Sequence, residues 1–233
     1  MIPMRLIRNR RLTIFSKRKR PGQSLVEFSL MLPILLMMLS GVIEFGFMLN
    51  FYLDVIDAAR ETARFAANDD PIRDANGNPL DPNPAFYDRA QDLAKQSLKS
   101  ASDGRIVWPE FAPEPYDCSD IKGDVVLSAF AVLGDTVAVR YPAGTGDTGV
   151  SMCGNYTSKL TTAEVNSILS GASLPNSGFV LVEIYYEYDL ILGLPWIQAF
   201  VPDPMVLYAY SIMPNTNVEP TSTPPGMGPP PPP

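Results

Sequence analysis

The sequence predicts an α+β fold, in which a long N-terminal transmembrane helix continues into a small extracytoplasmic domain of helices packed on an antiparallel sheet. An apolar run over residues 25–51 predicts the helix, because it is long enough to cross a bilayer. Alternating apolar residues after residue 124 predict strands, and the prolines near the C-terminus predict a disordered tail. The predicted segments are a basic leader, the helix, the domain and the tail, at residues 1–22, 23–68, 69–213 and 214–233.

Charge is divided unevenly along the chain. Eight of the 18 lysines and arginines lie in the first 20 residues, where there is no acidic residue. Without residues 1–22 the chain would hold 10 basic and 25 acidic residues, a net charge of -15. The basic end suits anionic lipid, whereas the acidic remainder argues against a nucleic-acid partner. Because basic residues flank the cytoplasmic end of a span, we expect a single-pass protein of the cell membrane with its N-terminus in the cytoplasm and its C-terminus outside.

The apolar run is the predicted membrane span. Glu27 and Glu44 are its only charged residues, and Pro33 near its start removes one backbone hydrogen bond. A secretory signal peptide is the first alternative, but such a peptide has a shorter apolar core and ends in a small-x-small cleavage site. This run is too long, and it continues into Glu44, Phe45 and Gly46. We therefore expect the apolar segment to be retained.

The residues before the span fit a different kind of processing. In "RPGQSLVEF" a basic leader is followed by Gly22, and Glu27 stands at the fifth position after it, before Phe28. This is the pattern of a type III signal, which is cut before the apolar segment. The stretch over residues 20–67, with "GVIEFGFML" and "DAARETARFAA", closely resembles the TadE-like family, pseudopilins of the tight-adherence (Flp) pilus machinery.

The resemblance implies a function and a set of partners. It implies a pseudopilin or minor pilin that assists the assembly or initiation of a tight-adherence pilus and that can be incorporated in the fibre. A membrane-embedded prepilin peptidase would cleave between Gly22 and Gln23, where glycine offers no side chain as an obstacle. The other implied partners are the membrane, other pilins and pseudopilins, and the pilus assembly platform. No cofactor is implied.

Glu27 is open to two interpretations. An ionised carboxylate in the middle of a membrane helix costs about 2.5 to 3.5 kcal/mol, so a positive partner at that depth is favourable. After cleavage, the amine of Gln23 and the unpaired N–H groups of the helix start favour a carboxylate one turn away. The resemblance implies that Glu27, followed by Phe28, neutralises the terminal amine of a neighbouring subunit. The alternative is that Glu27 lies among lipid headgroups and needs no partner.

Glu44 lies at the other end of the span. If the span begins near Leu25, a rise of about 1.5 Å per residue places Glu44 roughly 29 Å along the helix, near the outer interface. We interpret it as an interfacial carboxylate. Because Glu44, Phe45 and Gly46 also resemble the family pattern, a role in helix packing stays open.

Helical spacing continues beyond the membrane. Small and apolar residues recur at intervals of three and four, at Val55, Ala58, Ala59, Thr62, Ala63 and Ala66. This stripe predicts that the helix packs against the outer domain.

A loop rich in proline and aspartate follows; it lacks the full calcium-loop pattern and is interpreted as turns. A second helix is predicted over residues 85–101, with an apolar stripe of Phe86, Ala90, Leu93, Ala94 and Leu98.

The rest of the domain is predicted to be mainly strands. Residues 124–142 predict a hairpin about Gly134, and residues 158–171 predict a short helix with a capping box of Thr161 and Glu164. Residues 177–192 alternate as a half-buried antiparallel strand, and residues 205–213 form the last strand. The segment between these two strands, with Trp196 and Phe200, can cover the sheet or rest on lipid, and we expect core packing.

The two cysteines and the absence of histidine limit the chemistry of the chain. Cys118 and Cys153 are expected to form one disulfide that closes a loop of about 36 residues and stabilises by about 3 to 4 kcal/mol, with two unpaired buried thiols as the alternative. The chain has no histidine, which removes the commonest general base and metal ligand. We therefore expect no catalytic residue, no metal and no enzyme.

Two other functions are compatible with the sequence. One is a permanently membrane-anchored extracytoplasmic binding or adhesion module whose leader is never removed. The other is a carboxylate-dependent glycan-acting enzyme, because Glu183, Tyr185 and Glu187 share one face of a predicted strand. Strand alternation accounts for these residues already, so the enzyme is the weakest of the three.

Overall fold

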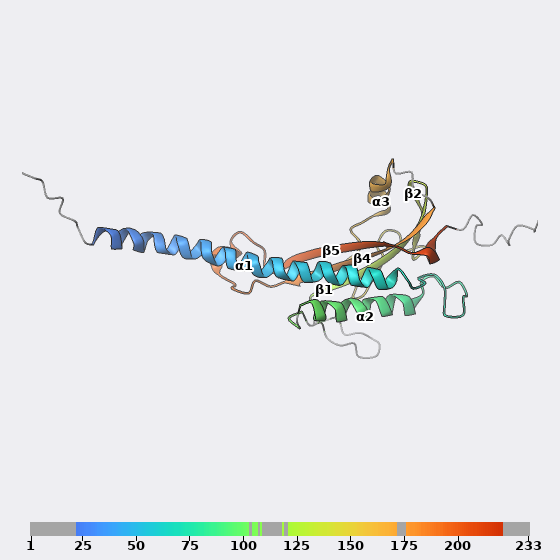
Figure 1. The fold of residues 1–233 in the computed structure, drawn as a ribbon, viewed down its shortest axis with the longest axis horizontal. Helices are drawn as coiled ribbons and strands as arrows, with labels where there is room; N and C mark the ends of the chain where they lie inside the picture. The colour runs from blue at the N-terminus through green and yellow to red at the C-terminus, as the bar shows by residue number, and fades with distance from the viewer. Residues whose placement is uncertain are drawn as a thin grey trace, which may run out of the picture. The chain divides into compact units, whose positions relative to one another are not determined.

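The computed structural model describes residues 22–102, 104–106, 108, 118, 121–171 and 176–220 (Figure 1). The chain forms two units, Met1–Gly41 and Val42–Pro233. Helix α1 (Gln23–Ala66) contributes its first residues to the first unit and residues 42–66 to the second, which we call the folded domain. Residues 1–21, most of the predicted leader, and residues 221–233 of the predicted tail lie outside the described residues.

In the first unit, α1 carries an apolar surface on all sides. Large apolar side chains between residues 25 and 39 are at least about one-third exposed, and Pro33 lies inside the helix. Within the part of the chain that the structure describes, α1 is the one helix whose length and composition would allow it to cross a membrane.

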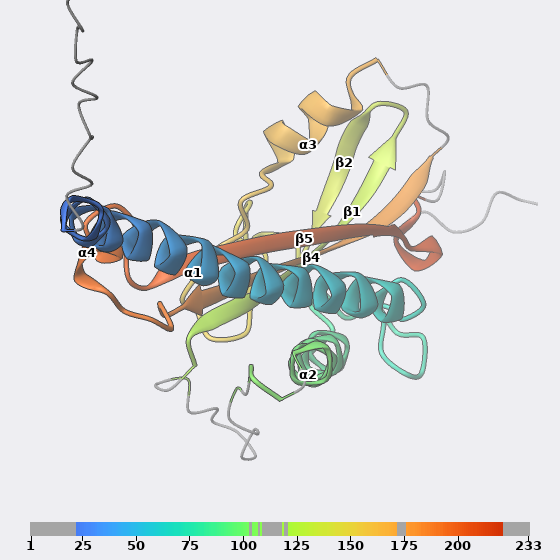
Figure 2. The same cartoon turned by 60° about the vertical axis from the view of Figure 1, so that its left-hand side comes forward.

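In the folded domain, α1 and α2 (Pro84–Ala101) cover one face of a sheet, as Figures 1 and 2 show. The predicted stripe of α1, from Val55 to Ala66, is buried, which confirms that this part of the helix packs on the domain. The apolar stripe predicted for α2 is also buried, apart from Leu93, which is half-buried. Small side chains on α1 let the sheet approach closely, because alanine adds little bulk between two backbones.

The sheet is antiparallel, with strand order β2-β1-β4-β5. Its strands are β1 (Gly123–Leu133), β2 (Thr136–Tyr141), β4 (Ser177–Tyr188) and β5 (Met205–Pro214), and the short β3 (Val150–Ser151) also pairs with β1. The predicted hairpin is formed by β1 and β2, with Gly134 in the left-handed region at φ 65°. The α+β fold class predicted from the sequence is confirmed.

The second face of the sheet is covered by α3 (Thr162–Leu169). Thr161 caps α3 by accepting a hydrogen bond from the Glu164 N–H, and the Glu164 side chain accepts from the Thr161 N–H, so the predicted capping box is present. Phe130, Val132, Val165 and Leu181 form a small apolar cluster between α3 and the strands. The prediction that β4 is half-buried is therefore wrong: most of its residues are buried on both faces, because a second layer covers the face turned away from α1.

The C-terminal boundary of the domain also differs from the prediction. The sequence placed the start of the tail at residue 214, but Pro214 ends β5 and a 3₁₀ helix, η1 (Thr216–Val218), follows. The Asn215 side-chain amide donates to the carbonyls of Ala66 and Asp69 at 2.9 Å and ties this segment to the end of α1. A proline-rich composition therefore does not define where the fold ends.

Candidate functional site

The predicted cleavage point lies at the start of α1. The Gly22 carbonyl accepts a hydrogen bond from the Val26 N–H at 3.2 Å, so regular helix begins directly after the glycine. Gly22 is exposed, and a Cβ placed on it would meet no atom within 4 Å. Among the residues that the structure describes, no atom therefore obstructs the approach to Gly22.

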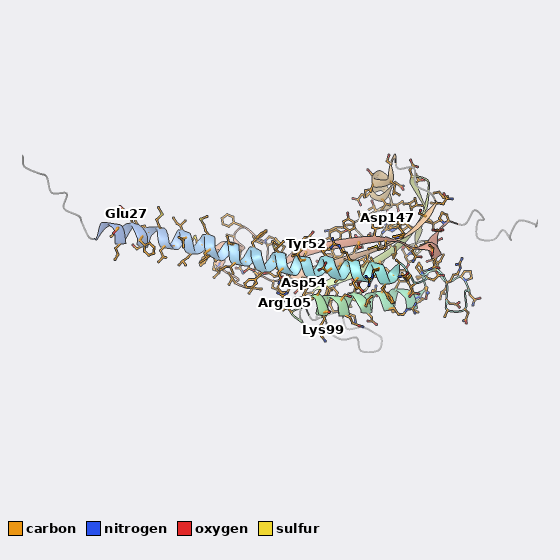
Figure 3. The ribbon with its side chains drawn as sticks, in the orientation of Figure 1. Glu27, Tyr52, Asp54, Lys99, Arg105 and Asp147 are labelled. Carbon is orange, nitrogen blue, oxygen red and sulfur yellow. A yellow bond between two sulfur atoms is a disulfide. The ribbon has the colours of Figure 1, made fainter. Side chains whose placement is uncertain are left out.

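Glu27 and Phe28 lie on the second turn of α1 (Figure 3). Both are exposed, Phe28 by 62%. The helix has no acidic residue in its first turn, so Glu27 is the first negative charge after the positive end of the helix dipole. The geometry brings Glu27 within about one turn and a half of Gln23 on the same helix.

Glu44 is buried in the folded domain, so it is not an exposed carboxylate, while its depth near the outer interface stays a prediction. Its side chain is 4% exposed although it follows an exposed apolar segment. Its Oε1 accepts hydrogen bonds from the Tyr188 hydroxyl at 2.7 Å and the Ile191 N–H at 2.8 Å, and its Oε2 accepts from the Leu192 N–H at 2.8 Å. The carboxylate thus fixes the segment after β4 to α1. The helix-packing role left open for Glu44, Phe45 and Gly46 stays a prediction.

The two residues after Glu44 are not buried as Glu44 is. Phe45 is 57% exposed and Gly46 meets no atom at a Cβ position, so neither shares the buried environment of Glu44. Burial, followed by the hydrogen bond to Glu44, raises the pKa of the Tyr188 hydroxyl above its ordinary value. Tyr188 therefore stays a donor to Glu44 at neutral pH.

A second polar contact on α1 was not predicted. The Arg105 guanidinium donates to Asp54 at 3.0 Å and lies 5.0 Å from the centre of the Phe51 ring (Figure 3). The contact between Arg105 and Asp54 connects the segment after α2 to α1. Asp54 and Arg105 are 51 positions apart, and no sequence pattern connects them, so the pair is seen only in the structure.

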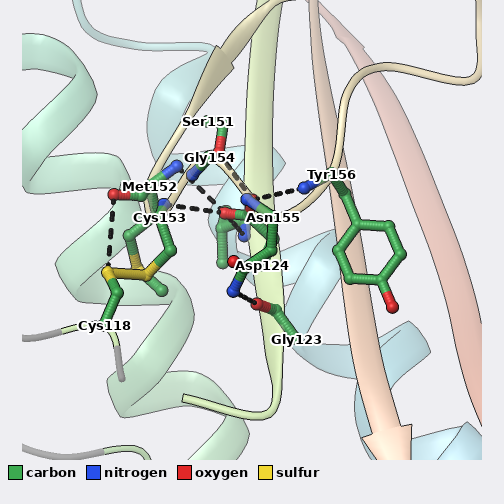
Figure 4. The surroundings of a disulfide bond; sticks show 10 residues. Cys118, Gly123, Asp124, Ser151, Met152, Cys153, Gly154, Asn155 and Tyr156 are labelled. Carbon is green, nitrogen blue, oxygen red and sulfur yellow. Dashed lines mark hydrogen bonds between the residues drawn. A yellow bond between two sulfur atoms is a disulfide. The ribbon is translucent and has the colours of Figure 1, made fainter. Parts of the chain in front are cut away.

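The two cysteines are joined. Cys118 and Cys153 form a disulfide with Cα atoms 5.6 Å apart, beside the buried carboxylate of Asp124 (Figure 4). That carboxylate accepts hydrogen bonds from the Ser151 hydroxyl and from the N–H groups of Val125, Met152, Cys153, Asn155 and Tyr156. Asp124 therefore holds the loop that carries Cys153 against β1, a role that no sequence pattern predicted.

The residues of the carboxylate-enzyme hypothesis lie under a loop. Glu183 is 0% exposed, and its Oε1 accepts from the Lys159 N–H at 2.9 Å and the Tyr208 hydroxyl at 2.7 Å. Tyr185 is buried and donates to the Thr157 carbonyl, and Glu187 accepts from the Tyr156 hydroxyl. These contacts attach the loop over residues 153–160 to the sheet, whereas Oε2 of Glu183 is buried without a hydrogen-bond partner among the described residues.

Comparison with known proteins identifies the N-terminal part of the chain. A family model described as "TadE-like protein" matches residues 22–64. A search of curated proteins and a search of solved structures found no match. The matched stretch contains Gly22, Glu27, Glu44 and nearly all of α1, and it ends before α2 and the sheet. The resemblance to the TadE-like family, which the sequence suggested over residues 20–67, is therefore confirmed for residues 22–64.

Proposed function

We propose that the protein is a pseudopilin or minor pilin that assists the assembly or initiation of a tight-adherence pilus. The TadE-like match indicates a protein associated with this pilus system. The position of the match supports the pseudopilin or minor-pilin role. The match begins at Gly22 and covers α1 through the span and most of the buried stripe. The family resemblance thus resides in the part of the chain that pilin-like proteins use for processing and lateral packing.

In this proposal a prepilin peptidase cleaves between Gly22 and Gln23, and the span stays in the membrane. The exposed Gly22 supports access by a peptidase. The exposed apolar surface of residues 25–39 supports burial in lipid, because extended exposed apolar patches are rare on soluble proteins. The basic leader supports a cytoplasmic N-terminus and an extracytoplasmic folded domain.

Glu27 would neutralise the terminal amine of a neighbouring subunit. It is one to two turns from the new N-terminus, so two such helices packed side by side with a small offset bring the amine of one near the carboxylate of the other. Each charge would lower the cost of burying the other in lipid. The protein would be a substrate and assembly partner, not a catalyst, and it would need no cofactor.

Mass spectrometry of the protein extracted from membranes tests the processing step. The expected mature N-terminus is Gln23, and Gly22→Val should abolish cleavage because the added side chain obstructs the peptidase. Gly46→Val is the matched control, since Gly46 is also a glycine with open space around it but lies away from the cleavage point. An intact leader on the wild-type chain in cells that produce the pilus would instead support the permanently anchored module.

Co-purification tests the packing step. Glu27→Ala should leave cleavage intact and remove association with other pilins, pseudopilins and the assembly platform. Glu61→Ala is the control, because Glu61 is an exposed glutamate of the same helix outside the span. Equal recovery of partners by Glu27→Ala and the wild type would refute the neutralisation role.

A further inference from the structure

The segment that Glu44 holds is a continuous apolar loop between β4 and β5. Residues 190–202 contain no charged side chain, and the carboxylates of Asp189 and Asp203 stand at its two ends. Asp189 forms an ion pair with Lys122, and Asp203 accepts from the Leu190 N–H at 3.2 Å and the Gln198 amide at 3.0 Å. Asp189 and Asp203 thus have binding partners at the two ends of the loop, and the side chains between them are uncharged and mostly apolar.

The loop has two sides. Leu190 and Ile197 face the core and are 8% and 9% exposed. Ile191 and Phe200 point outward and are 52% and 88% exposed, and Trp196 is 38% exposed on the short helix α4 (Pro195–Gln198). The expectation that Trp196 and Phe200 pack in the core is therefore wrong for Phe200 and incomplete for Trp196. A loop that is anchored by one set of apolar residues and displays another has the form of a docking surface.

The position of the loop along α1 decides what it docks to. The loop is bound at Glu44, immediately after residues 25–43 of α1, in which Glu27 is the one charged residue. At about 1.5 Å per residue, 19 helical residues span about 28 Å, close to the thickness of a bilayer core of about 30 Å. When α1 crosses the membrane, Glu44 and the loop therefore lie at the level of the outer headgroups. Figure 1 shows the loop, in orange, around α1.

The surface of α1 next to Glu44 also exposes apolar side chains, as the loop over residues 190–202 does. Val42, Phe45, Phe47 and Leu49 are between 39% and 68% exposed, and they belong to the same unit as the loop. Tryptophan and other amphipathic rings are enriched at the boundary between headgroups and acyl chains, where an apolar body and a polar edge are both accommodated. The exposed apolar side chains of residues 42–49 and of the loop therefore have the composition of an interfacial surface.

We propose that residues 190–202 insert Ile191, Trp196 and Phe200 into the outer leaflet of the bilayer, at the boundary of headgroups and acyl chains. The proposal rests on the proposed function, because it requires α1 to cross the membrane. The loop then gives the folded domain a second contact with lipid beside the helix. Two contacts restrict the tilt of the domain relative to the bilayer and its height above it, which a single helix leaves free.

Site-specific fluorescence on the full chain in phosphatidylcholine vesicles tests the inference. A bimane label is placed at one new cysteine at a time, by Phe200→Cys in the loop, Ile168→Cys on α3 and Leu36→Cys in the span; Cys118 and Cys153 are paired in the disulfide and do not react. Ile168 is the matched control, because it is 65% exposed and lies in the same domain away from the loop. Quenching is measured with iodide in the water and with lipids that carry a nitroxide, placed near the headgroup for residues 168 and 200 and deep in the acyl chain for residue 36.

The expected result is that lipid nitroxides quench the label at residue 200 at least twofold more than the label at residue 168, and that iodide does the reverse. Equal access of iodide to residues 200 and 168, with residue 36 quenched by lipid, would overturn the inference and leave the membrane span intact. Protection of residue 200 from both quenchers would also overturn it, because a second protein surface would then cover the loop. No lipid quenching at residue 36 would refute the span itself and thereby the proposed function.

Discussion

Replacing Glu44 by alanine should release the loop over residues 190–202 from α1. The carboxylate accepts three hydrogen bonds, from the Tyr188 hydroxyl and from the N–H groups of Ile191 and Leu192. Without it these donors lose their acceptor, and leaving a buried donor unpaired costs about 1–3 kcal/mol. At the lower limit for each of the three, the loss is about 3 kcal/mol, which corresponds to a factor of about 150 in the opening equilibrium of the loop.

Hydrogen exchange measured by mass spectrometry on the full chain in lipid nanodiscs follows this opening directly. Peptides that contain Ile191 and Leu192 should exchange about 150-fold faster in Glu44→Ala, since local opening sets the exchange rate. Peptides from the centre of the β4–β5 ladder, where Glu183 pairs with Tyr210, should change far less. Glu61→Ala removes a solvent-exposed carboxylate of α1 and should match the wild type. If the loop of Glu44→Ala exchanges within threefold of the wild type, Glu44 does not hold it.

Three further predictions concern the stability of the folded domain. Asp124→Ala should lower the free energy of unfolding by about 3 kcal/mol or more, because several buried and part-buried N–H groups lose their acceptor; urea denaturation followed by circular dichroism measures it. Cys153→Ser should cost about 3–4 kcal/mol in the same assay, and reduction of the wild type should lower its stability to the level of the variant. Burial and the Glu187 hydrogen bond raise the pKa of Tyr156 to about 12, and burial followed by Glu183 raises the pKa of Tyr208 above its ordinary value. The folded state therefore holds these protons more tightly than the unfolded state, so their contribution is complete below pH 10 and is lost as the pH rises further; denaturation midpoints between pH 8 and pH 11.5 should fall accordingly. A midpoint that stays constant over that range would contradict the raised values.

Elements that depend on local chemistry were predictable from the sequence. The stripe from Val55 to Ala66 was found because residues three and four apart share one face of a helix, whatever the helix packs on. The capping box of Thr161 and Glu164 was found because both of its hydrogen bonds lie within four residues. The hairpin about Gly134 follows in the same way from a short turn between two apolar runs.

Burial by a second layer was not predictable from the same patterns. Alternation along β4 identifies the residues that share a face, but it does not reveal whether α3 and the loop over residues 153–160 will cover that face. For the same reason the sequence did not predict that the Lys159 N–H and the Tyr208 hydroxyl donate hydrogen bonds to Glu183 in the fold. Phe200 shows the opposite error, because an aromatic residue in an apolar segment was expected inside and lies outside.

The two glutamates of α1 show which roles in the candidate site can be predicted from the sequence and which cannot. Glu27 and Glu44 are both single carboxylates in the apolar run, and each is followed by phenylalanine. The proposed role of Glu27 depends on Gly22 and the leader, which stand next to it in the chain, so the sequence is sufficient to state it. The role of Glu44 depends on Tyr188 and Leu192, which follow it by 144 and 148 residues, and no local pattern connects them. A carboxylate at the end of a membrane span is therefore better assigned by asking which distant N–H and O–H groups reach it than by its depth along the helix.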